Sequence, residues 1–143
     1  MATNGVINGT KFGVYAAGTK VGYATSASLS INHNLRDTST KDSGGWRSQL
    51  EGQRDFEVSV EGMVIFTETG GGAITDLTMD ELYTTYIATR TLFTIKFSTE
   101  VTGDYAWSGS AFMTSLSADA PNEDSSTWSA SFSGSGALTQ AAV

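Results

Sequence analysis

The chain has 143 residues, of which 39% are hydrophobic and 10% aromatic, enough for one domain with its own core and too apolar for a disordered chain. It contains no cysteine, which excludes disulfides and thiolate metal sites. The net charge is −7, and no basic residue follows Lys96, so the sequence lacks the basic surface that grips nucleic acid tightly.

Neither a membrane segment nor a secretory signal is visible in the sequence. No apolar run approaches the roughly 18 residues that span a bilayer. The first residues, MATNGVINGTKFG, have no basic segment followed by an apolar core. We therefore expect a protein that is made in a cytoplasm and does not insert into membranes.

The first part of the chain predicts three strands. Lys11–Tyr15 and Lys20–Ala24 are short strands joined by a hairpin turn at residues 16–19. Along Ser26–His33, serines alternate with larger side chains, which is typical of a strand with one buried and one hydroxyl-rich face. The residues assigned to the buried face are Ala27, Leu29, Ile31 and His33.

The clearest strand in the sequence is Arg54–Phe66. One face carries Asp55, Glu57 and Glu61. These carboxylates resemble a cation site, but no loop that would wrap an ion accompanies them, and a solvated polar face is the commoner explanation. The residues assigned to the opposite, core face are Phe56, Val58, Val60, Gly62, Val64 and Phe66.

A long polar connection, Lys41–Gly52, separates these two strands. Its sequence, KDSGGWRSQLEG, bends at Gly44-Gly45 and contains two large apolar side chains, Trp46 and Leu50. Hairpin loops usually take two to five residues, so the length of this one indicates a function. Two interpretations remain open: the apolar side chains fold back as a lid over the core, or they anchor a contact with another molecule, where Trp and Arg tend to dominate binding.

One helix is predicted, at Met79–Ala88. Thr78 and Glu81 form a capping box at its start. An apolar stripe follows at helical spacing, and we expect it to pack on a sheet. The members of the stripe are Met79, Leu82, Tyr83, Tyr86 and Ile87.

Three more strands are predicted in the rest of the chain. Thr91–Phe97 alternates regularly, whereas Tyr105–Ala118 changes its apolar phase at Gly109, which predicts a bulge or bend there. An acidic turn, Asp119–Asp124, precedes the last strand, Ser126–Leu138, which has one apolar face and one face of Ser and Thr. Taken together, these patterns predict one mostly-β domain over residues 1–143, with six to eight strands and one helix.

No catalytic constellation is present in the sequence. The one histidine, His33, lies on a strand face assigned to the core, where a structural role is commoner than catalysis. Gly70-Gly71-Gly72 lacks the Lys-Ser/Thr of a phosphate loop. The serines follow strand period two, so they mark surfaces and not nucleophiles. We therefore expect no enzyme activity, no cofactor and no metal.

Several segments resemble the major tail tube proteins of long-tailed bacteriophages. The resemblance begins at ATSASLSINHN, is most specific at KDSGGW (Lys41–Trp46) followed by Gly52, and continues through LEGQRDFEVSVEG. The run from Tyr105 to Thr139, around its proline-containing turn, and the position of the helix are also similar. The first twenty residues match only loosely.

The resemblance implies a structural protein of the virion tail. Its fold would be a β-sandwich or barrel-like domain with one flanking helix, akin to type VI secretion tubes. Six copies would join their sheets into a ring, and rings would stack into a conduit for DNA. The C-terminal strands, which few prolines or charges protect, would supply edges for that pairing.

The same resemblance implies partners and a location. The partners would be other copies of the chain, the tape measure protein, the tail terminator, and baseplate or tail-tip proteins. Phage DNA would pass through without tight binding. The protein would be found in the host cytoplasm during assembly and in the virion tail afterwards.

Two sets of residues are candidates for these roles. The polar connection would make subunit or ring contacts, and carboxylates would line the channel, because negative charge on a wall keeps DNA mobile. For the three carboxylates on one strand, an outward, solvated position is an open alternative. The contact candidates are Lys41, Asp42, Ser43, Gly44, Gly45, Trp46, Arg47 and Leu50, and the channel candidates are Asp55, Glu57, Glu61 and Asp104.

The alternative function is a monomeric β-sandwich binding or adhesion module, lectin-like or on a capsid surface. Such a module would use the same strands and serine-rich faces. Its mass in solution would stay small and constant, whereas a tube protein would form rings or polymerise.

Overall fold

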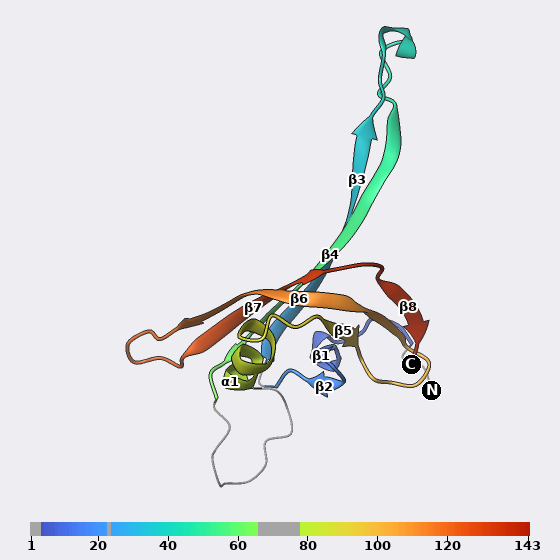
Figure 1. Cartoon of the computed structure of the whole chain (residues 1–143). Helices are drawn as coiled ribbons and strands as arrows, with labels where there is room; N and C mark the ends of the chain where they lie inside the picture. Colours follow the sequence, from blue (N-terminus) through green and yellow to red (C-terminus); the bar gives the residue numbers. More distant parts are fainter. Residues whose placement is uncertain (1–3, 23, 66–77) are drawn as a thin grey trace.

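The computed structural model describes residues 4–22, 24–65 and 78–143, so Phe66 and Gly70-Gly71-Gly72 lie outside the described residues. Its eight strands form one antiparallel sheet in the order β2-β1-β5-β6-β7-β4-β3, with β8 paired to β6. The end of the sheet with β1, β2 and β5 lies below β6, on the side of the helix (Figure 1). The strands are β1 (Gly13–Ala16), β2 (Thr19–Lys20), β3 (Ala24–Asp37), β4 (Gln49–Met63), β5 (Phe93–Ser98), β6 (Tyr105–Asp119), β7 (Thr127–Gly134) and β8 (Thr139–Ala142).

This architecture confirms the predicted mostly-β class with one short helix. The layers expected of a sandwich are formed by one continuous sheet, and not by two separate sheets. The predicted N-terminal hairpin is also confirmed, with shorter strands than the sequence indicated: Tyr15 pairs with Lys20 and Ala16 with Thr19.

The core is built on the alternation predicted for β4 and β7. Val58 pairs with Phe132 and Val60 with Ala130, so the apolar faces of the two strands lie side by side. The Trp128 indole Nε1–H donates to the Met63 carbonyl oxygen at 2.8 Å, which satisfies the only polar atom that this side chain buries. The fully or nearly buried residues of these two strands are Phe56, Val58, Val60, Trp128, Ala130 and Phe132.

Two glycines make room for the Phe56 ring. A Cβ built on Gly134 would lie 2.3 Å from Cε1 of Phe56, and one built on Gly109 would lie 2.8 Å from its Cζ. The sequence predicted a bulge at Gly109. The β5–β6 pairing instead continues regularly past it, since Ile95 pairs with Gly109. This glycine is therefore needed for close packing.

We expect Gly134→Ala to destabilise the protomer by about 1–3 kcal/mol, because the added methyl overlaps a buried ring and overpacking costs this much. The measurement is the midpoint of urea unfolding. Ser135→Ala, at the exposed neighbouring position, is the matched control and should leave the midpoint in place. Equal midpoints for Gly134→Ala and the wild-type chain would contradict this account of the packing.

The apolar phase predicted for β6 after Gly109, with Phe112, Leu116 and Ala118 on one face, is only partly correct. Leu116 packs against the core, but Phe112 is exposed, and Ala111 and Met113 face the core instead. The irregularity in the strand lies between Met113 and Ser115, where the pairing with β7 shifts by one residue. Ala111 is small and contributes little to the hydrophobic pattern of the sequence. The larger neighbouring side chain, Phe112, therefore determined the predicted phase.

The helix begins where the sequence predicted. It has an α-helical turn, α1 (Met79–Leu82), followed by a π-helical turn, η3 (Tyr83–Ile87). The Thr78 N–H donates to Glu81 Oε2 at 3.3 Å, which is one half of the predicted capping box. Within the predicted stripe, Leu82 and Tyr86 are buried and Tyr83 is exposed, because the i→i+5 bond from the Ala88 N–H to Tyr83 changes the angular spacing.

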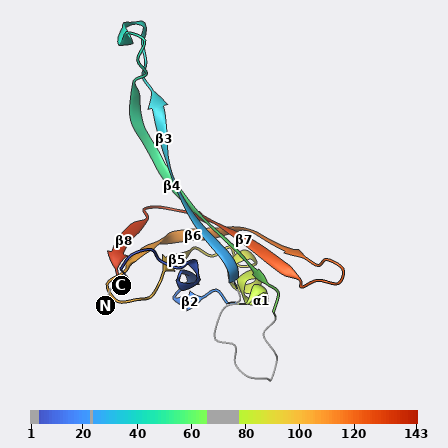
Figure 2. The same ribbon diagram turned by 180° about the vertical axis from the view of Figure 1, so that it is seen from behind.

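A two-stranded arm projects from the body of the protomer. It consists of the distal halves of β3 and β4 and the turn between them, and both views show it standing away from the rest of the sheet (Figures 1 and 2). β4 pairs with β7 only from Glu57 to Met63, so the arm strands pair only with each other. His33 lies on this arm and is exposed, which corrects its predicted burial.

The edges of the sheet differ in part from those predicted. Of the C-terminal strands, β7 is interior, since it pairs with β4 on one side and β6 on the other, whereas β8 pairs only with β6 among the described residues. The long unpaired edge belongs instead to β3, which is 14 residues long and contains no proline. The edge at the other end of the sheet is β2, which has two residues. The sequence could not reveal this order, because pairing depends on which strands meet in space.

Candidate functional site

Short polar residues hold the tip of the arm in one shape. The Thr38 N–H donates to the Ser48 carbonyl oxygen at 2.9 Å, and the Ser48 N–H donates to Ser39 Oγ at 2.7 Å. The Ser39 N–H in turn donates to Asp37 Oδ1 at 2.9 Å. This bond is the main reason that the pKa of Asp37 is lowered from its ordinary value, and the charge of Arg47 contributes to the same shift.

The tip carries the candidate contact residues. The chain reverses through the 3-10 turn η2 (Lys41–Ser43) and through Gly44 and Gly45, whose φ angles of 64° and 81° favour glycine. Trp46 follows with 83% of its surface exposed. The lid interpretation is therefore wrong for the protomer. The structure brings the candidates from Lys41 to Arg47 together at the tip, all exposed apart from Ser43, whose side chain is not described.

The rest of the arm carries one exposed leucine on each face, among polar and charged residues. Leu35 is 50% exposed and Leu50 54% exposed. Leu35 pairs with Glu51 and Arg36 with Leu50, so the two leucines lie on opposite faces of the ribbon. An isolated two-stranded ribbon is at best marginally stable in water, so an arm with apolar side chains on two faces is suited to being covered.

A bulge at the base of the arm explains the glycine that the family resemblance emphasised. The β3–β4 register shifts between His33 and Leu35. A Cβ on Gly52 would lie 2.2 Å from the Asn34 carbonyl oxygen, so only glycine fits opposite that residue. The candidate Leu50 lies within β4, which begins at Gln49, and not in a loop as the sequence indicated.

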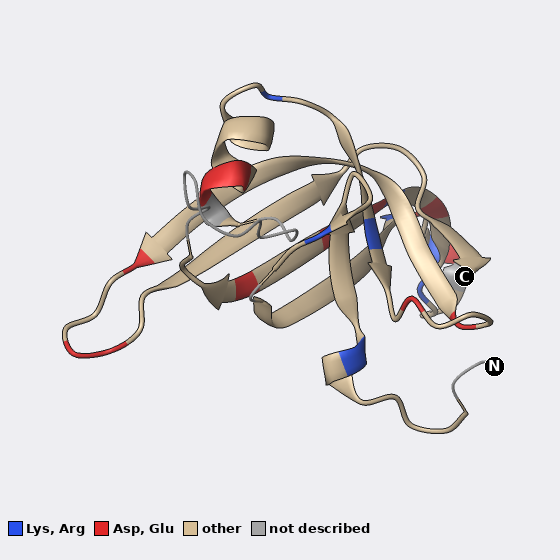
Figure 3. Cartoon of the chain, turned by 90° about the horizontal axis from the view of Figure 1, so that it is seen from below, with Lys and Arg blue, Asp and Glu red and all other residues tan. Residues whose placement is uncertain are grey.

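The arm and the rest of the chain carry opposite charge. Residues 34–54 hold four bases and three acids, net +1, whereas the remaining residues hold four bases and twelve acids, net −8. The acids of the β6–β7 turn form an exposed end of the molecule (Figure 3, the red loop at the left). The bases in residues 34–54 are Arg36, Lys41, Arg47 and Arg54, and the acids are Asp37, Asp42 and Glu51.

The outward face of the sheet, opposite the core, carries hydroxyls and carboxylates. Glu57 pairs with Ser30 of β3 on one side and with Ser133 of β7 on the other. Glu61 lies between Ser129 of β7 and the start of β3 in the same way. We call this surface the polar wall and define it by the outward residues Ser26, Ser28, Ser30, Glu57, Ser59, Glu61, Ser115, Ser117, Ser129, Ser131 and Ser133.

The polar wall combines the serine faces of β3 and β7 with the carboxylate face of β4, which the sequence predicted as separate surfaces. The serine faces of β3 and β7 were expected from their alternation, but only the strand order places the carboxylates of β4 between them. The serines bond one another, as Ser117 Oγ and Ser129 Oγ do at 2.6 Å. The defined wall contains no Lys or Arg, so its charge is negative.

Asp104 does not belong to this wall. It is 7% exposed, and the Thr99 hydroxyl donates to its Oδ2 at 2.7 Å. Its prediction as a channel-lining carboxylate is therefore wrong, because a turn before β6 buries the side chain in the protomer. Asp55, Glu57 and Glu61 are exposed, as a wall position requires.

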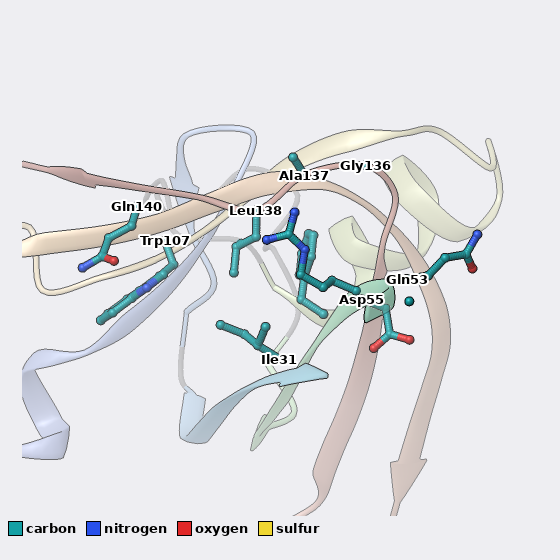
Figure 4. A pocket seen from close by; sticks show the side chains of 11 residues that line it. Ile31, Gln53, Asp55, Trp107, Gly136, Ala137, Leu138 and Gln140 are labelled. Atoms are coloured by element: carbon teal, nitrogen blue, oxygen red, sulfur yellow. The ribbon is translucent and has the colours of Figure 1, made fainter. Parts of the chain in front are cut away.

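A pocket of about 670 Å³ opens at the base of the arm. Ile31 and Leu138 lie around its centre, with Trp107 and Gln140 at one end and Gln53 and Asp55 at the other (Figure 4). No pattern in the sequence indicated this site. Ile31 was assigned to the core, yet it is 56% exposed, and no pattern connects β3 with the segment before β8.

A sequence model of the phage tail tube protein family matches residues 11–140. The chain belongs to the phage tail tube protein family. Its structural role in a phage tail follows from that membership, and the predicted resemblance is confirmed. No curated protein sequence matches the chain at a significant level.

Solved structures share the fold of this tail tube protein at low sequence identity. A chain of the virion of a native gene transfer agent particle is 18% identical, with a TM-score of 0.75, over 96% of this chain and 100% of that one. A chain of the SPP1 tail tube is 12% identical, with a TM-score of 0.69, over 96% and 80%. A chain of an extracellular contractile injection system, from its sheath/tube terminator, is 17% identical, with a TM-score of 0.65, over 99% and 100%.

Within residues 4–22, 24–65 and 78–143, no three His, Asp or Glu side chains are grouped to hold a metal ion. Over the same residues, no helix has the length and apolar character needed to cross a bilayer.

Proposed function

We propose that this tail tube protein assembles into hexameric rings that stack into a conduit for phage DNA. The observation that carries the proposal is the arm, which has an exposed leucine on each face and an exposed Trp46 at its tip, and is therefore suited to being covered by a partner surface. Six-fold symmetry is supported by the empty gene transfer agent particle, whose tail, solved with C6 symmetry, contains a chain 18% identical to this one with a TM-score of 0.75.

Rings close through strand edges in this proposal. The β3 edge is long, has no proline and is unpaired in the protomer, and such an edge readily templates another strand. The other edges belong to the two-residue strand β2 and the four-residue strand β8, so the edges are not alike. Pairing between unlike surfaces is heterologous and generates a ring when the rotation closes.

Rings stack through the arms. The arm carries net +1 and the rest of the chain net −8, so an arm is attracted to the body of another copy. Covering Leu35 and Leu50 removes apolar surface from water on both faces of the ribbon. The contact candidates at the tip, from Lys41 to Arg47, would then lie between rings.

The polar wall lines the channel. Its serines are neutral, and its carboxylates repel phosphate, so the surface offers DNA no cationic contact. Glu57 and Glu61 would be repeated around each ring and would form negatively charged hoops. Asp55 lies at the boundary between this wall and the pocket at the arm base.

The remaining partners belong to the same proposal. A tube needs components that set its length and close its ends, and we assign these contacts to tape measure, terminator, and baseplate or tail-tip proteins. The terminator and baseplate assignments are supported by the matching chains from a sheath/tube terminator and from an anti-feeding prophage baseplate. The protein would assemble in the host cytoplasm and reside in the virion tail.

We expect the purified chain to form rings or tubes at high concentration or when added to tail-initiating components. Negative-stain microscopy with light scattering is the measurement, and averaged end views should show six-fold symmetry. A chain that stays monomeric at high concentration and is absent from the tubes of particles would contradict the proposal and favour a monomeric binding module.

A further inference from the structure

The pocket at the arm base is built as an acceptor for a large flat side chain. Ile31 and Leu138 give it an apolar centre, and Trp107 closes one end (Figure 4). The small residues Gly136 and Ala137 border the same space. Binding hot spots in proteins have this form, with an apolar floor that a polar rim shields from water.

The polar groups around the pocket match the chemistry of tryptophan. An indole has one N–H donor, and Gln53 and Gln140, whose side chains carry amide oxygen acceptors, lie at the two ends of the pocket with their amides directed away from its apolar centre (Figure 4). Arg54 also lines the pocket, and a guanidinium stacks favourably on an indole face.

The only exposed tryptophan among the described residues is Trp46, at the arm tip. It cannot reach the pocket of its own chain. From Ile31 to Asp37, at about 3.3 Å per extended residue, β3 alone carries the arm roughly 20 Å away from the pocket, and the tip lies beyond that point (Figure 1). A second copy displaced by the length of the arm would place its pocket at this tip, so that every copy is both donor and acceptor.

We infer that Trp46 of one copy inserts into the pocket formed by Ile31, Trp107 and Leu138 of a second copy in the adjacent ring. This inference rests on the proposed function and specifies its stacking contact. The occupant is the arm tip of an identical chain, because the tip carries the one exposed tryptophan among the described residues and a net positive charge, and the chain outside residues 34–54 is strongly acidic. The pocket lining itself holds one base, Arg54, and one acid, Asp55.

The absence of native cysteine permits a direct test by cross-linking. Arg47→Cys with Gln140→Cys places one thiol beside the donor tryptophan and one at the rim of the acceptor pocket. Within one chain the extended part of β3 alone separates these positions by roughly 20 Å, beyond the reach of a disulfide. Assembled tubes of this variant should give ladders of cross-linked chains. Arg47→Cys with Ser117→Cys, which puts the second thiol on the polar wall, should not.

A second variant tests the pocket without a cross-linker. Ile31→Trp adds a large side chain at an exposed position inside the pocket and should block stacking while rings still form. Tyr83→Trp, at an exposed position on the helix, should stack normally.

The outcomes separate the two levels of the proposal. Tubes that form from the Arg47→Cys, Gln140→Cys chain without cross-links, together with normal stacking of Ile31→Trp, would overturn the pocket assignment and leave the tube function standing. A wild-type chain that forms no tubes would overturn both.

Discussion

Trp46→Ala should abolish ring stacking and leave the protomer folded. The side chain is 83% exposed, and exposed substitutions usually change stability by about 0.5 kcal/mol or less. As a binding anchor, it should contribute at least about 2 kcal/mol to each contact, which is roughly a 30-fold loss of affinity. In the proposed hexameric ring, six such contacts would act together, so the loss would be multiplied. Sedimentation and electron microscopy measure stacking, and urea unfolding measures protomer stability.

Tyr83→Ala is the matched control, since it removes another exposed aromatic side chain outside the arm. It should change neither quantity. If Trp46→Ala lowers the free energy of unfolding by about 3–5 kcal/mol, as expected of a core tryptophan, the interpretation of Trp46 as a lid over the core would be correct. If Trp46→Ala is stable and forms normal tubes, Trp46 does not contribute to the contact between rings.

Glu57→Lys with Glu61→Lys should slow DNA ejection or leave DNA in the tail, in particles that assemble normally. At physiological ionic strength the Debye length is about 8 Å, so a wall charge acts on DNA that passes close to it. The double substitution converts two repulsive positions per subunit into phosphate-binding positions. The measurement is the ejection rate from purified particles triggered in vitro.

Glu123→Lys with Asp124→Lys gives the same change in net charge on the exposed β6–β7 turn. Ejection from those particles should be unchanged. Equal slowing by both pairs would mean that total charge matters and position does not. Unchanged ejection from the Glu57→Lys, Glu61→Lys particles would show that these side chains do not line the channel, or that the sign of the wall charge is unimportant.

Local chemistry made much of the fold predictable. The core face of β4, the apolar face of β7, the start of the helix and the bend at Gly44-Gly45 each follow from a pattern within a few residues. The strand order does not, because it depends on which strands meet. The β3 pattern was therefore read correctly as a strand but wrongly as buried beyond Leu29, where the strand leaves the body and becomes the arm.

The candidate site was predictable to a similar extent. A tryptophan in a polar connection marked the tip, but the sequence left its burial open. Asp104 was grouped with the strand carboxylates on charge alone, since its hydrogen bond from Thr99 is a local turn contact with no periodic signal. The pocket at the arm base combines β3, β4, β6 and the segment before β8, and only the three-dimensional arrangement unites them.

The arm, whose strands pair only with each other, has a consequence for how growth would begin. A ribbon without outside support opens at low free energy in a free subunit, and ordering its backbone costs about 1–2 kcal/mol per residue. When two free subunits meet, both arms must be ordered to form a single contact. At the end of an existing ring stack, the acceptor surfaces are already ordered. Elongation of an existing tube is therefore favoured over nucleation of a new one. The supply of tail protein would then remain dispersed until an initiator provides the first template.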